Sequence, residues 1–278
     1  MNVGIVGLGL IGGSMAKAVK NRTAHTVWGI DLDGETMSLS RMSGAIDAPL
    51  TEENIPQCDL IMIAIRPGAA IQWVKDHAKL IAKSAILVDL CGVKRDVVKA
   101  IAPIAAQQGF AYIGGHPMAG RERSGFTSAT EDLYVGASMI LTPDDKTDMP
   151  LLETLKHFFL DVGFGSLTFS TPEEHDRIIA YTSQLAHIVS SAYVKSPVAQ
   201  RRRGFSAGSF RDMTRVARLD ENMWTELMLS DADYLVKELG ILIENIAAYK
   251  DALERMDEEK LRQLLKEGRE AKASAGGN

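Results

Sequence analysis

Gly7, Gly9 and Gly12 have the spacing G-x-G-x-x-G, which is typical of a turn that holds a phosphate group. Residues 3–6 before them are strand-like and residues 14–19 after them are helix-like, as a dinucleotide-binding fold requires. The first glycine would make the sharp turn, the second would admit a pyrophosphate, and the third would let helix and strand pack closely. Backbone amides and the helix dipole would then hold the anion. We therefore expect a cofactor site formed by Gly7, Leu8, Gly9, Leu10, Ile11 and Gly12.

A carboxylate follows about 20 positions later, at the distance expected for a ribose ligand. Asp31 ends the apolar run of residues 26–30 and could accept hydrogen bonds from both hydroxyls of an adenosine ribose. It could also be a loop residue that caps the next helix, but its place after the glycines and the strand favours the ribose role. Leu32 and Asp33 follow it, so a 2′-phosphate would meet two carboxylates. We therefore expect NAD rather than NADP.

A polar face with little charge marks the helix predicted over residues 172–195. The apolar stripe of this helix consists of Ile178, Leu185, Val189 and Ala192. Ser183, His187 and Ser190 lie on the opposite side, where a face turned to bulk water would carry Lys and Glu. This face is therefore expected to line a polar cavity. For His187 an interior histidine with satisfied hydrogen bonds is an equal alternative.

Arg215 could clamp a carboxylate through two parallel hydrogen bonds, a geometry that lysine does not reproduce. Its neighbours Phe210, Met213 and Val216 are apolar, and the segment follows a glycine-containing turn that could bring the guanidinium into a cleft. The alternative is a surface or capping arginine near a helix end. We expect an anion-binding residue.

Length and composition limit the number of domains and the kinds of partner that this protein can have. The chain has 278 residues, 46% hydrophobic and 24% charged, with a formal net charge of -5. It is long enough for two cores and too short for three ordinary domains. The acidic balance argues against a nucleic-acid partner, and the basic run Arg201-Arg202-Arg203 is typical of a solvated helix end. Cys58 and Cys91 are far apart and fit no metal or redox motif, so no metal is expected.

The apolar start of the chain lacks the features of an export signal. Only Met1 and Asn2 precede it, where an export signal has a positively charged leader. Lys17 and Lys20 interrupt the run before it reaches the length of about 20 residues that a membrane helix needs. We expect a soluble, cytoplasmic protein without a membrane partner.

Short apolar runs alternate with helical stretches through the first half of the chain, which predicts a β-α-β sheet that is mostly parallel. The predicted strands after the first two are residues 59–65, 85–90, 110–113, 137–141 and 166–169. Ligands in such sheets bind beyond the carboxyl ends of the strands, so Ile65 and the turn of residues 66–68 are candidate site residues. No strand pattern follows the helix start at residues 170–174. We therefore expect an α/β fold with a Rossmann-type doubly wound domain at 1–170, followed by an all-α domain at 171–278.

A long apolar seam runs through the last predicted helix, residues 225–256. The seam consists of Met228, Ala232, Leu235, Leu239, Leu242, Ile246, Tyr249, Leu253 and Met256, widened by Leu227, Val236, Ile243 and Ala247. Core packing within one chain could use it, but its length and breadth favour a homodimer interface. Residues 257–266 could continue as a charged helix, and residues 273–278 are expected to be disordered.

Four stretches resemble the prephenate dehydrogenases and the related arogenate dehydrogenases. Residues 116–125, HPMAGRERSG, resemble their HP-x-AG-x-E-x-SG signature, and residues 182–187, TSQLAH, resemble their TSHLPH helix. Residues 208–217, GSFRDMTRVA, resemble GFRDxTRIA, and residues 220–224, DENMW, resemble D-P-x-M-W. The matches are collinear with the glycine motif and span most of the chain.

This resemblance implies an NAD-dependent oxidative decarboxylation of prephenate to 4-hydroxyphenylpyruvate, a step of tyrosine biosynthesis. His116 would be the base at the substrate hydroxyl, because an imidazole titrates near neutral pH. His187 would contact the substrate from the helical domain, and Arg215 would hold a substrate carboxylate. Glu122 would shape the pocket mouth, and Ser124 would join the substrate site.

Alternatives stay open at this point. Gln184 replaces the first histidine of TSHLPH, and Gly92 stands where the family often has serine, which bears on the finer substrate contacts. The sequence does not distinguish prephenate from arogenate, which would yield tyrosine directly. A 3-hydroxy acid dehydrogenase would need a catalytic lysine on a G-x-x-x-K helix, which the sequence does not present after the sheet. A non-catalytic NADH sensor would give His116 and Arg215 no shared function.

Overall fold

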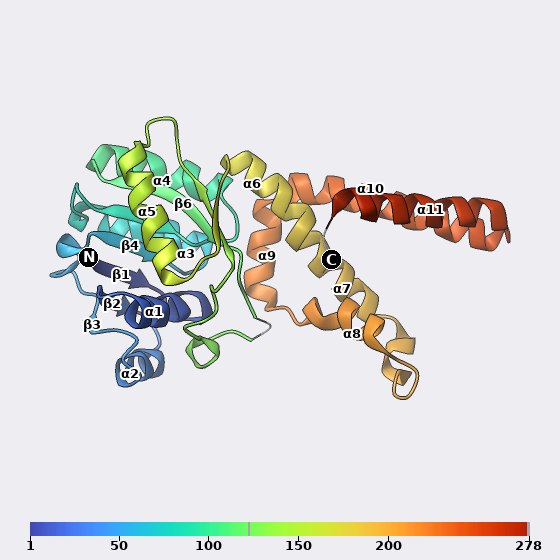
Figure 1. Cartoon of the computed structure of the whole chain (residues 1–278), viewed down its shortest axis with the longest axis horizontal. Coiled ribbons are helices and arrows are strands. Elements are labelled where there is room, and N and C mark those ends of the chain that lie inside the picture. Colours follow the sequence, from blue (N-terminus) through green and yellow to red (C-terminus); the bar gives the residue numbers. More distant parts are fainter. Residues whose placement is uncertain (122, 277–278) are drawn as a thin grey trace. The chain divides into compact units, whose positions relative to one another are not determined.

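The computed structural model describes residues 1–121 and 123–276. Its N-terminal part is built on one eight-stranded sheet with the order β3-β2-β1-β4-β5-β6-β7-β8 (Figure 1). The strands are β1 (Asn2–Val6), β2 (Thr26–Ile30), β3 (Ala48–Pro49), β4 (Leu60–Ile63), β5 (Ile86–Asp89), β6 (Ala111–Pro117), β7 (Ser138–Thr142) and β8 (Ser166–Phe169). All neighbouring strands are parallel except β6 and β7. The predicted fold class is confirmed.

Helices cover both faces of this sheet, because successive side chains of each strand point to opposite faces. The helices are α1 (Leu10–Arg22), α2 (Gly34–Met42), α3 (Pro67–His77), α4 (Arg95–Gln108) and α5 (Met149–Val162). In β4, Leu60 and Met62 pack in a core with residues of α1 and α5, whereas Ile61 and Ile63 pack in a second core with residues of α3 and α4. Strands buried on both faces read as continuous apolar runs. This is why the sequence reveals them.

A helical segment follows the sheet. It consists of α6 (Pro172–Ile179), a π-helix (Ala180–Leu185), α7 (Ala186–Val194), α8 (Gly208–Thr214) and α9 (Glu221–Ser230). Short 3-10 helices lie at Ile55–Gln57, Ala78–Leu80, Phe126–Ser128, Pro197–Arg201 and Arg215–Ala217. The helix predicted over residues 172–195 is present, with the π-helix at its centre. Ile178 at the start of the expected apolar stripe is nevertheless 45% exposed.

The long helix expected over residues 225–256 is interrupted, so that prediction is wrong. α9 ends at Ser230, and α10 (Ala232–Glu254) starts after Asp231. The side chain of Asp231 is buried and accepts hydrogen bonds from Arg95 and from Gln184. The helix thus breaks at Asp231, a residue whose partners are far away in the sequence, and a local pattern does not reveal such contacts.

The C-terminal helices form a hairpin. Met256 has a φ of 54°, which stops α10 from continuing, and Asp257 caps α11 (Glu258–Ala275) through the amide of Lys260. The Tyr249 hydroxyl donates to the Leu264 carbonyl oxygen at 3.0 Å, which ties the two helices together. Residues 257–266 therefore start a new helix rather than extend the previous one. The disorder expected from residue 273 onward is wrong for residues 273–275, which are helical, and residues 277–278 lie outside the described residues.

The chain divides into two compact units, Met1–Asp231 and Ala232–Asn278. The first contains the sheet and the helices up to α9, and the second contains the hairpin of α10 and α11. The expected domain boundary at residue 170 stays a prediction. Within the described residues, no helix combines the length and the apolar character needed to cross a membrane.

Candidate active site

The glycine turn has the geometry that its three glycines predict. Gly7 has a φ of +86°, and a Cβ there would clash with Ile65. A Cβ on Gly12 would collide with the Gly7 carbonyl oxygen. A Cβ on Gly9 would meet nothing within 4 Å, so this position opens onto space that a ligand can fill. The turn therefore fits a dinucleotide pyrophosphate, with Ile65 beside it.

Asp31 is bound to this turn. One carboxylate oxygen accepts a hydrogen bond from the Leu8 amide at 2.8 Å, and the other accepts from the Asp33 amide at 3.0 Å. The helix α2 is capped by Asp33, which accepts from the Thr36 amide, and not by Asp31. The capping alternative for Asp31 is thereby excluded, and its carboxylate lies beside the glycine turn as a ribose ligand would.

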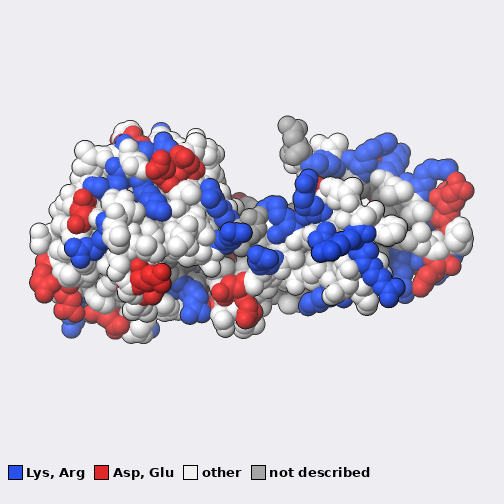
Figure 2. All heavy atoms as spheres, turned by 90° about the horizontal axis from the view of Figure 1, so that it is seen from below, with Lys and Arg blue, Asp and Glu red and all other residues white. Residues whose placement is uncertain are grey.

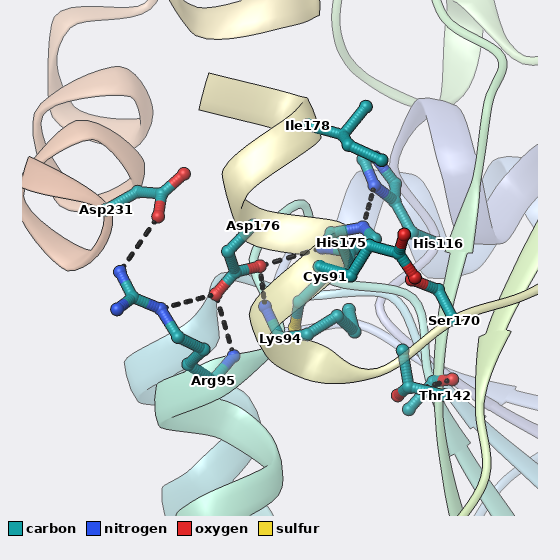
Figure 3. A network of polar contacts seen from close by, with 12 residues as sticks. Cys91, Lys94, Arg95, His116, Thr142, Ser170, His175, Asp176, Ile178 and Asp231 are labelled. Carbon is teal, nitrogen blue, oxygen red and sulfur yellow. Dashed lines mark hydrogen bonds and ion pairs between the residues drawn. The ribbon is translucent and has the colours of Figure 1, made fainter. Parts of the chain in front are cut away.

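His116 lies near the carboxyl end of β6, and its ring forms the end of a chain of polar contacts (Figure 3). Its Nδ1 is 2.9 Å from Nε2 of His175, and the Nδ1 of His175 is 2.7 Å from a carboxylate oxygen of Asp176. His175 and Asp176 are buried on α6, whereas His116 is only partly buried. Three side chains from two elements thus form a line from a buried carboxylate to an accessible imidazole.

The positions of the protons on His116 and His175 follow from the carboxylate of Asp176. Asp176 accepts from Nδ1–H of His175, so Nε2 of a neutral His175 is an acceptor and Nδ1 of His116 must be the donor. The Nε2 atom of His116 then carries the lone pair. It lies on the side of Gly92, since a Cβ built on that glycine would be 4.0 Å from it. His116 is therefore arranged as a base.

The electrostatics keep this base neutral. Burial lowers the pKa of His116 well below its usual value of 6.5, and His175 and Lys94 lower it further. Burial also lowers the pKa of His175, although its bond to Asp176 acts in the opposite direction. Burial raises the pKa of Asp176, but hydrogen bonds from His175 and from backbone amides outweigh this and hold it below its usual value. Asp176 is thus a carboxylate that can stabilise a proton gained by the histidines.

Hydrogen bonds and a buried ion pair at the start of α4 hold His175 and Asp176 in place. The Asp176 carboxylate accepts from the backbone amides of Lys94 and Arg95 at 2.7 and 2.8 Å. The Lys94 side chain forms a fully buried ion pair with Asp89 at the end of β5. Asp89 also accepts from the hydroxyl of Tyr112 at 2.7 Å. The start of α4 therefore links the sheet to α6.

Gln184, one of the two departures from the family pattern, belongs to the neighbouring part of this network. Its Nε2 donates to Asp231 at 3.2 Å, and Asp231 also pairs with Arg95 at 3.0 Å. The Gln184 Oε1 atom is buried without a hydrogen-bond partner among the described residues. Gln184 therefore supports the structure around Asp231, on the π-helix of the α6–α7 segment.

His187 and Ser190 are partnered by the backbone of the helices that follow them. His187 donates from Nδ1 to the Val216 carbonyl oxygen at 3.0 Å, and its ring centroid is 4.0 Å from that of Trp224. Ser190 donates to the Met213 carbonyl oxygen at 2.8 Å. Burial lowers the pKa of His187, and Arg215 lowers it further. Helix packing thus explains much of the predicted polar face, and His187 retains a ring nitrogen, Nε2, that can contact a ligand.

Arg215 lies at the start of the 3-10 helix Arg215–Ala217 and lines a pocket of about 530 Å³. We call this the arginine pocket; its lining residues are Arg121, Arg123, Thr127, Ser128, Thr130, Thr214, Arg215 and Arg218. Ser124 is exposed and is not among them. Glu122 lies outside the described residues. The structure therefore groups the predicted anion ligand with three further arginines.

His175 and Asp176 are the residues that sequence reasoning missed. The segment containing them was interpreted only as a helix start, which the cap by Thr171 on the Glu174 amide confirms. One signal was present: a histidine and an acidic residue lie side by side one turn into the helix, on the side that becomes buried. Among the described residues, no cluster of His, Cys, Asp and Glu is arranged to hold a metal ion.

Two family models match the chain. The nucleotide-binding domain of prephenate dehydrogenase matches residues 15–166, and the dimerization domain of prephenate dehydrogenase matches residues 171–267. The chain belongs to the prephenate dehydrogenase family. The expected family is confirmed, and with it the class of the enzyme, an oxidoreductase of the dehydrogenase type.

Individual members of the family are similar over most of their length. The prephenate dehydrogenase of Bacillus subtilis is 30% identical over 94% of this chain and 72% of its own length. A crystal structure of prephenate dehydrogenase from A. aeolicus, in complex with hydroxyphenyl propionate and NAD+, has a TM-score of 0.86 at 28% identity and covers 99% of this chain and 98% of its own. Synechocystis arogenate dehydrogenase has a TM-score of 0.80 at 25% identity, over 99% of this chain and 100% of its own.

Proposed function

We propose that this protein catalyses the NAD-dependent oxidative decarboxylation of prephenate to 4-hydroxyphenylpyruvate, in the cytoplasmic synthesis of tyrosine. The observation that carries the proposal is the line Asp176–His175–His116, which leaves an imidazole lone pair at an accessible position. The similar protein from A. aeolicus, whose structure holds NAD+ and a phenolic acid, supports the same cofactor and substrate class.

The cofactor site fits NAD. The turn at Gly7, Gly9 and Gly12 would hold the pyrophosphate, Asp31 would hold the adenosine ribose, and Ile65 would pack against the cofactor. Leu8, Leu10 and Ile11 would contribute backbone to the same turn. NAD, when bound, supplies the acceptor for the hydride. A second phosphate on the ribose would lie close to the Asp31 carboxylate, which disfavours NADP.

The catalytic step requires a base at the substrate hydroxyl. As the hydride leaves the carbon that bears this hydroxyl, Nε2 of His116 takes up part of the hydroxyl proton. His175 donates no proton in this step; it accepts from Nδ1–H of His116, and Asp176 stabilises the positive charge that develops. The bond to the ring carboxylate breaks, its electron pair completes the aromatic ring, and carbon dioxide departs. The proton returns to the phenol oxygen of the product.

The remaining predicted site residues are assigned to the substrate. Arg215 would pair with a substrate carboxylate, and His187 would contact the substrate through Nε2. Glu122 and Ser124 would lie near the pocket mouth, as the family resemblance implies. The lowered pKa of His187 keeps that ring neutral, so it acts as a polar contact rather than as a second cation.

The assembly that we propose is a homodimer formed through the C-terminal helices. The dimerization domain of the family covers residues 171–267. In α10, Val236, Ile243, Ile246 and Leu253 are each more than half exposed, which is unusual for apolar side chains unless a partner covers them. The domain boundary near residue 170 belongs to the same proposal.

The second candidate is arogenate dehydrogenase activity. Two similar proteins support this candidate. One is Synechocystis arogenate dehydrogenase, 25% identical, and the other is the cyclohexadienyl dehydrogenase of Zymomonas mobilis, 27% identical over 98% of this chain. The experiment is NADH formation by the purified protein with prephenate and with arogenate, each with NAD and with NADP. Turnover of prephenate with NAD supports the proposal. NADH binding without turnover of either substrate would instead indicate a non-catalytic sensor.

A further inference from the structure

The start of α3 is capped by a side chain from a distant helix. Pro67 occupies the first helical position and has no amide hydrogen, so the first amide of this helix that needs an acceptor is that of Gly68. Within the described part of the chain, the side chain of Arg66, the N-cap residue, makes no capping hydrogen bond. Instead the Glu226 carboxylate on α9, 158 positions later, accepts from the Gly68 amide at 2.6 Å. A helix N-terminus favours such a negative charge, and the bond ties α9 to α3.

The capped end of α3 borders the proposed cofactor site. It follows Ile65, whose side chain lies so close to Gly7 of the glycine turn that a Cβ on this glycine would clash with it. The same segment comes directly after the carboxyl end of β4, where ligands of parallel sheets bind. NAD bound at the glycine turn would therefore lie beside the segment that Glu226 holds.

Two further side chains of α9 reach the proposed substrate site. The ring centroid of Trp224 is 4.0 Å from that of His187. Leu227 faces Gly92, because a Cβ built on this glycine would be 3.5 Å from Leu227 Cδ2 and 4.0 Å from His116 Nε2. One turn of α9 therefore contacts residues of both proposed sites.

Few contacts fix the position of α9. Among the described residues of this helix none is fully buried, and Leu227 only borders one of the two cores. An element with few buried contacts shifts or opens at a low cost in free energy. A ligand that fixes such an element at one site reduces the cost of ordering it for a ligand at the other. The bond between Glu226 and Gly68 is thus placed to transmit order between the sites.

We propose that Glu226 is a positioning residue that couples the two sites: through its bond to the Gly68 amide, NAD and the aromatic substrate each strengthen the binding of the other. This inference rests on the proposed function, which assigns the two ligands. Neither ligand has to touch Glu226. NAD holds the start of α3 in place, the bond extends this order to α9, and α9 then keeps Trp224 against His187.

The test measures binding, so it does not depend on turnover. The full-length protein is titrated with NAD by calorimetry, alone and with saturating hydroxyphenyl propionate, which is bound together with NAD+ in the A. aeolicus structure. The reverse titration, of hydroxyphenyl propionate with and without NAD, must give the same factor because coupling is reciprocal. The variants are Glu226→Ala, which removes the acceptor, and Glu226→Gln, whose amide oxygen can still accept from the Gly68 amide.

The matched control is Glu221→Ala, which replaces an exposed glutamate in the first turn of α9. Basic side chains gather over the helices on the face shown in Figure 2, with few acidic ones among them. Loss of any acidic side chain from these helices raises their attraction for acidic ligands, and the control removes the same charge from the same helix. The titrations are done at constant ionic strength, and the melting temperature shows whether each variant is folded.

In the native protein, saturating hydroxyphenyl propionate should lower the Kd for NAD about fivefold or more. Glu226→Ala should reduce this factor to less than about twofold, because α9 is no longer tied to α3. Glu226→Gln should keep an intermediate factor, since a neutral acceptor makes a weaker bond than a carboxylate. Glu221→Ala should keep the native factor. A residue that only stabilised the fold would change the melting temperature and leave the factor unchanged.

Three results would overturn the inference: a native factor near one, a factor of native size in Glu226→Ala, or an equal loss of the factor in Glu221→Ala. If Glu226→Ala fails to fold, Glu226→Met decides the matter, because it keeps the length of the side chain and offers only a weak acceptor. A factor of native size in that variant would overturn the inference as well. All these results leave the proposed function standing, whereas absence of turnover with both prephenate and arogenate would refute the function itself.

Discussion

Replacing His175 by phenylalanine should slow catalysis without preventing cofactor binding. The substitution removes the acceptor that orients His116, which lies 2.9 Å away. Loss of one buried hydrogen-bond partner costs about 1–3 kcal/mol. If this cost falls on the transition state, kcat drops about 5- to 150-fold, since each 1.36 kcal/mol corresponds to about a tenfold change in rate.

The fold should survive this change. Asp176 loses the bond from His175 but keeps the amides of Lys94 and Arg95 and the Nε of Arg95, at 2.7, 2.8 and 3.3 Å. A phenyl ring fills the space of the imidazole, so no large cavity forms. The variant should therefore lose activity while its melting temperature changes only modestly.

The assay compares kcat, KM and NAD affinity of His175→Phe with those of His175→Gln and of the control His157→Phe, an exposed histidine on α5. Glutamine can accept from His116 and donate to Asp176, so it should recover part of the rate. An unchanged kcat in His175→Phe would refute the positioning role. A parallel loss of NAD affinity and kcat would indicate a structural role instead.

Four further outcomes follow from the same geometry. His116→Asn should lower kcat by about 100- to 10,000-fold with little change in prephenate affinity. Because the pKa of His116 is held below 6.5, the rate of the native protein should stay level from neutral pH to 6.5 and fall only at lower pH. A loss of rate that begins above pH 6.5 would contradict this. Arg215→Ala should raise the prephenate KM about tenfold or more with NAD affinity unchanged, as titration would show, because Arg215 is an exposed residue and a charge pair partly screened by solvent contributes less than a fully buried one. Asp31→Ser should reduce the ratio of kcat/KM for NAD over NADP, and equal use of both cofactors by the native protein would refute the assigned role. Glutamate at both Leu239 and Leu242 should dissociate the dimer in sedimentation velocity, whereas a native monomer at micromolar concentration would remove the argument.

Local patterns were sufficient to predict the sheet and the glycine turn. Strands buried on both faces appear as short apolar runs, and only β3, which has two residues, escaped notice. The tasks of the glycines at 7, 9 and 12 depend on backbone close approach within a few residues, so spacing alone predicts them. The position of Asp31 beside this turn followed from the same local logic, and its role as a ribose ligand stays a prediction.

The break at Asp231 could not be predicted in this way. The apolar spacing continues through residues 228–256 without interruption, so periodicity favours one helix. The contacts of Asp231 are with Arg95, 136 positions earlier, and with Gln184, 47 positions earlier. An ion pair between such distant positions leaves no mark on the local pattern. For the same reason, the hydrogen bond between His116 and His175 was outside the reach of sequence reasoning.

The network around Arg95 links His116, the proposed base, to the helices that follow the sheet. Arg95 donates through its amide and its Nε to Asp176, and its side chain also pairs with Asp231, where α9 ends. Replacing one member of such a buried set leaves an unpaired charge, which costs more than the net contribution of the pair. Substitutions of Asp176 should therefore affect stability and catalysis together, whereas His175, the neutral residue between Asp176 and His116, can be replaced with its catalytic effect nearly isolated. The assignment of roles in this site accordingly depends on variants of the histidines rather than of the carboxylate that supports them.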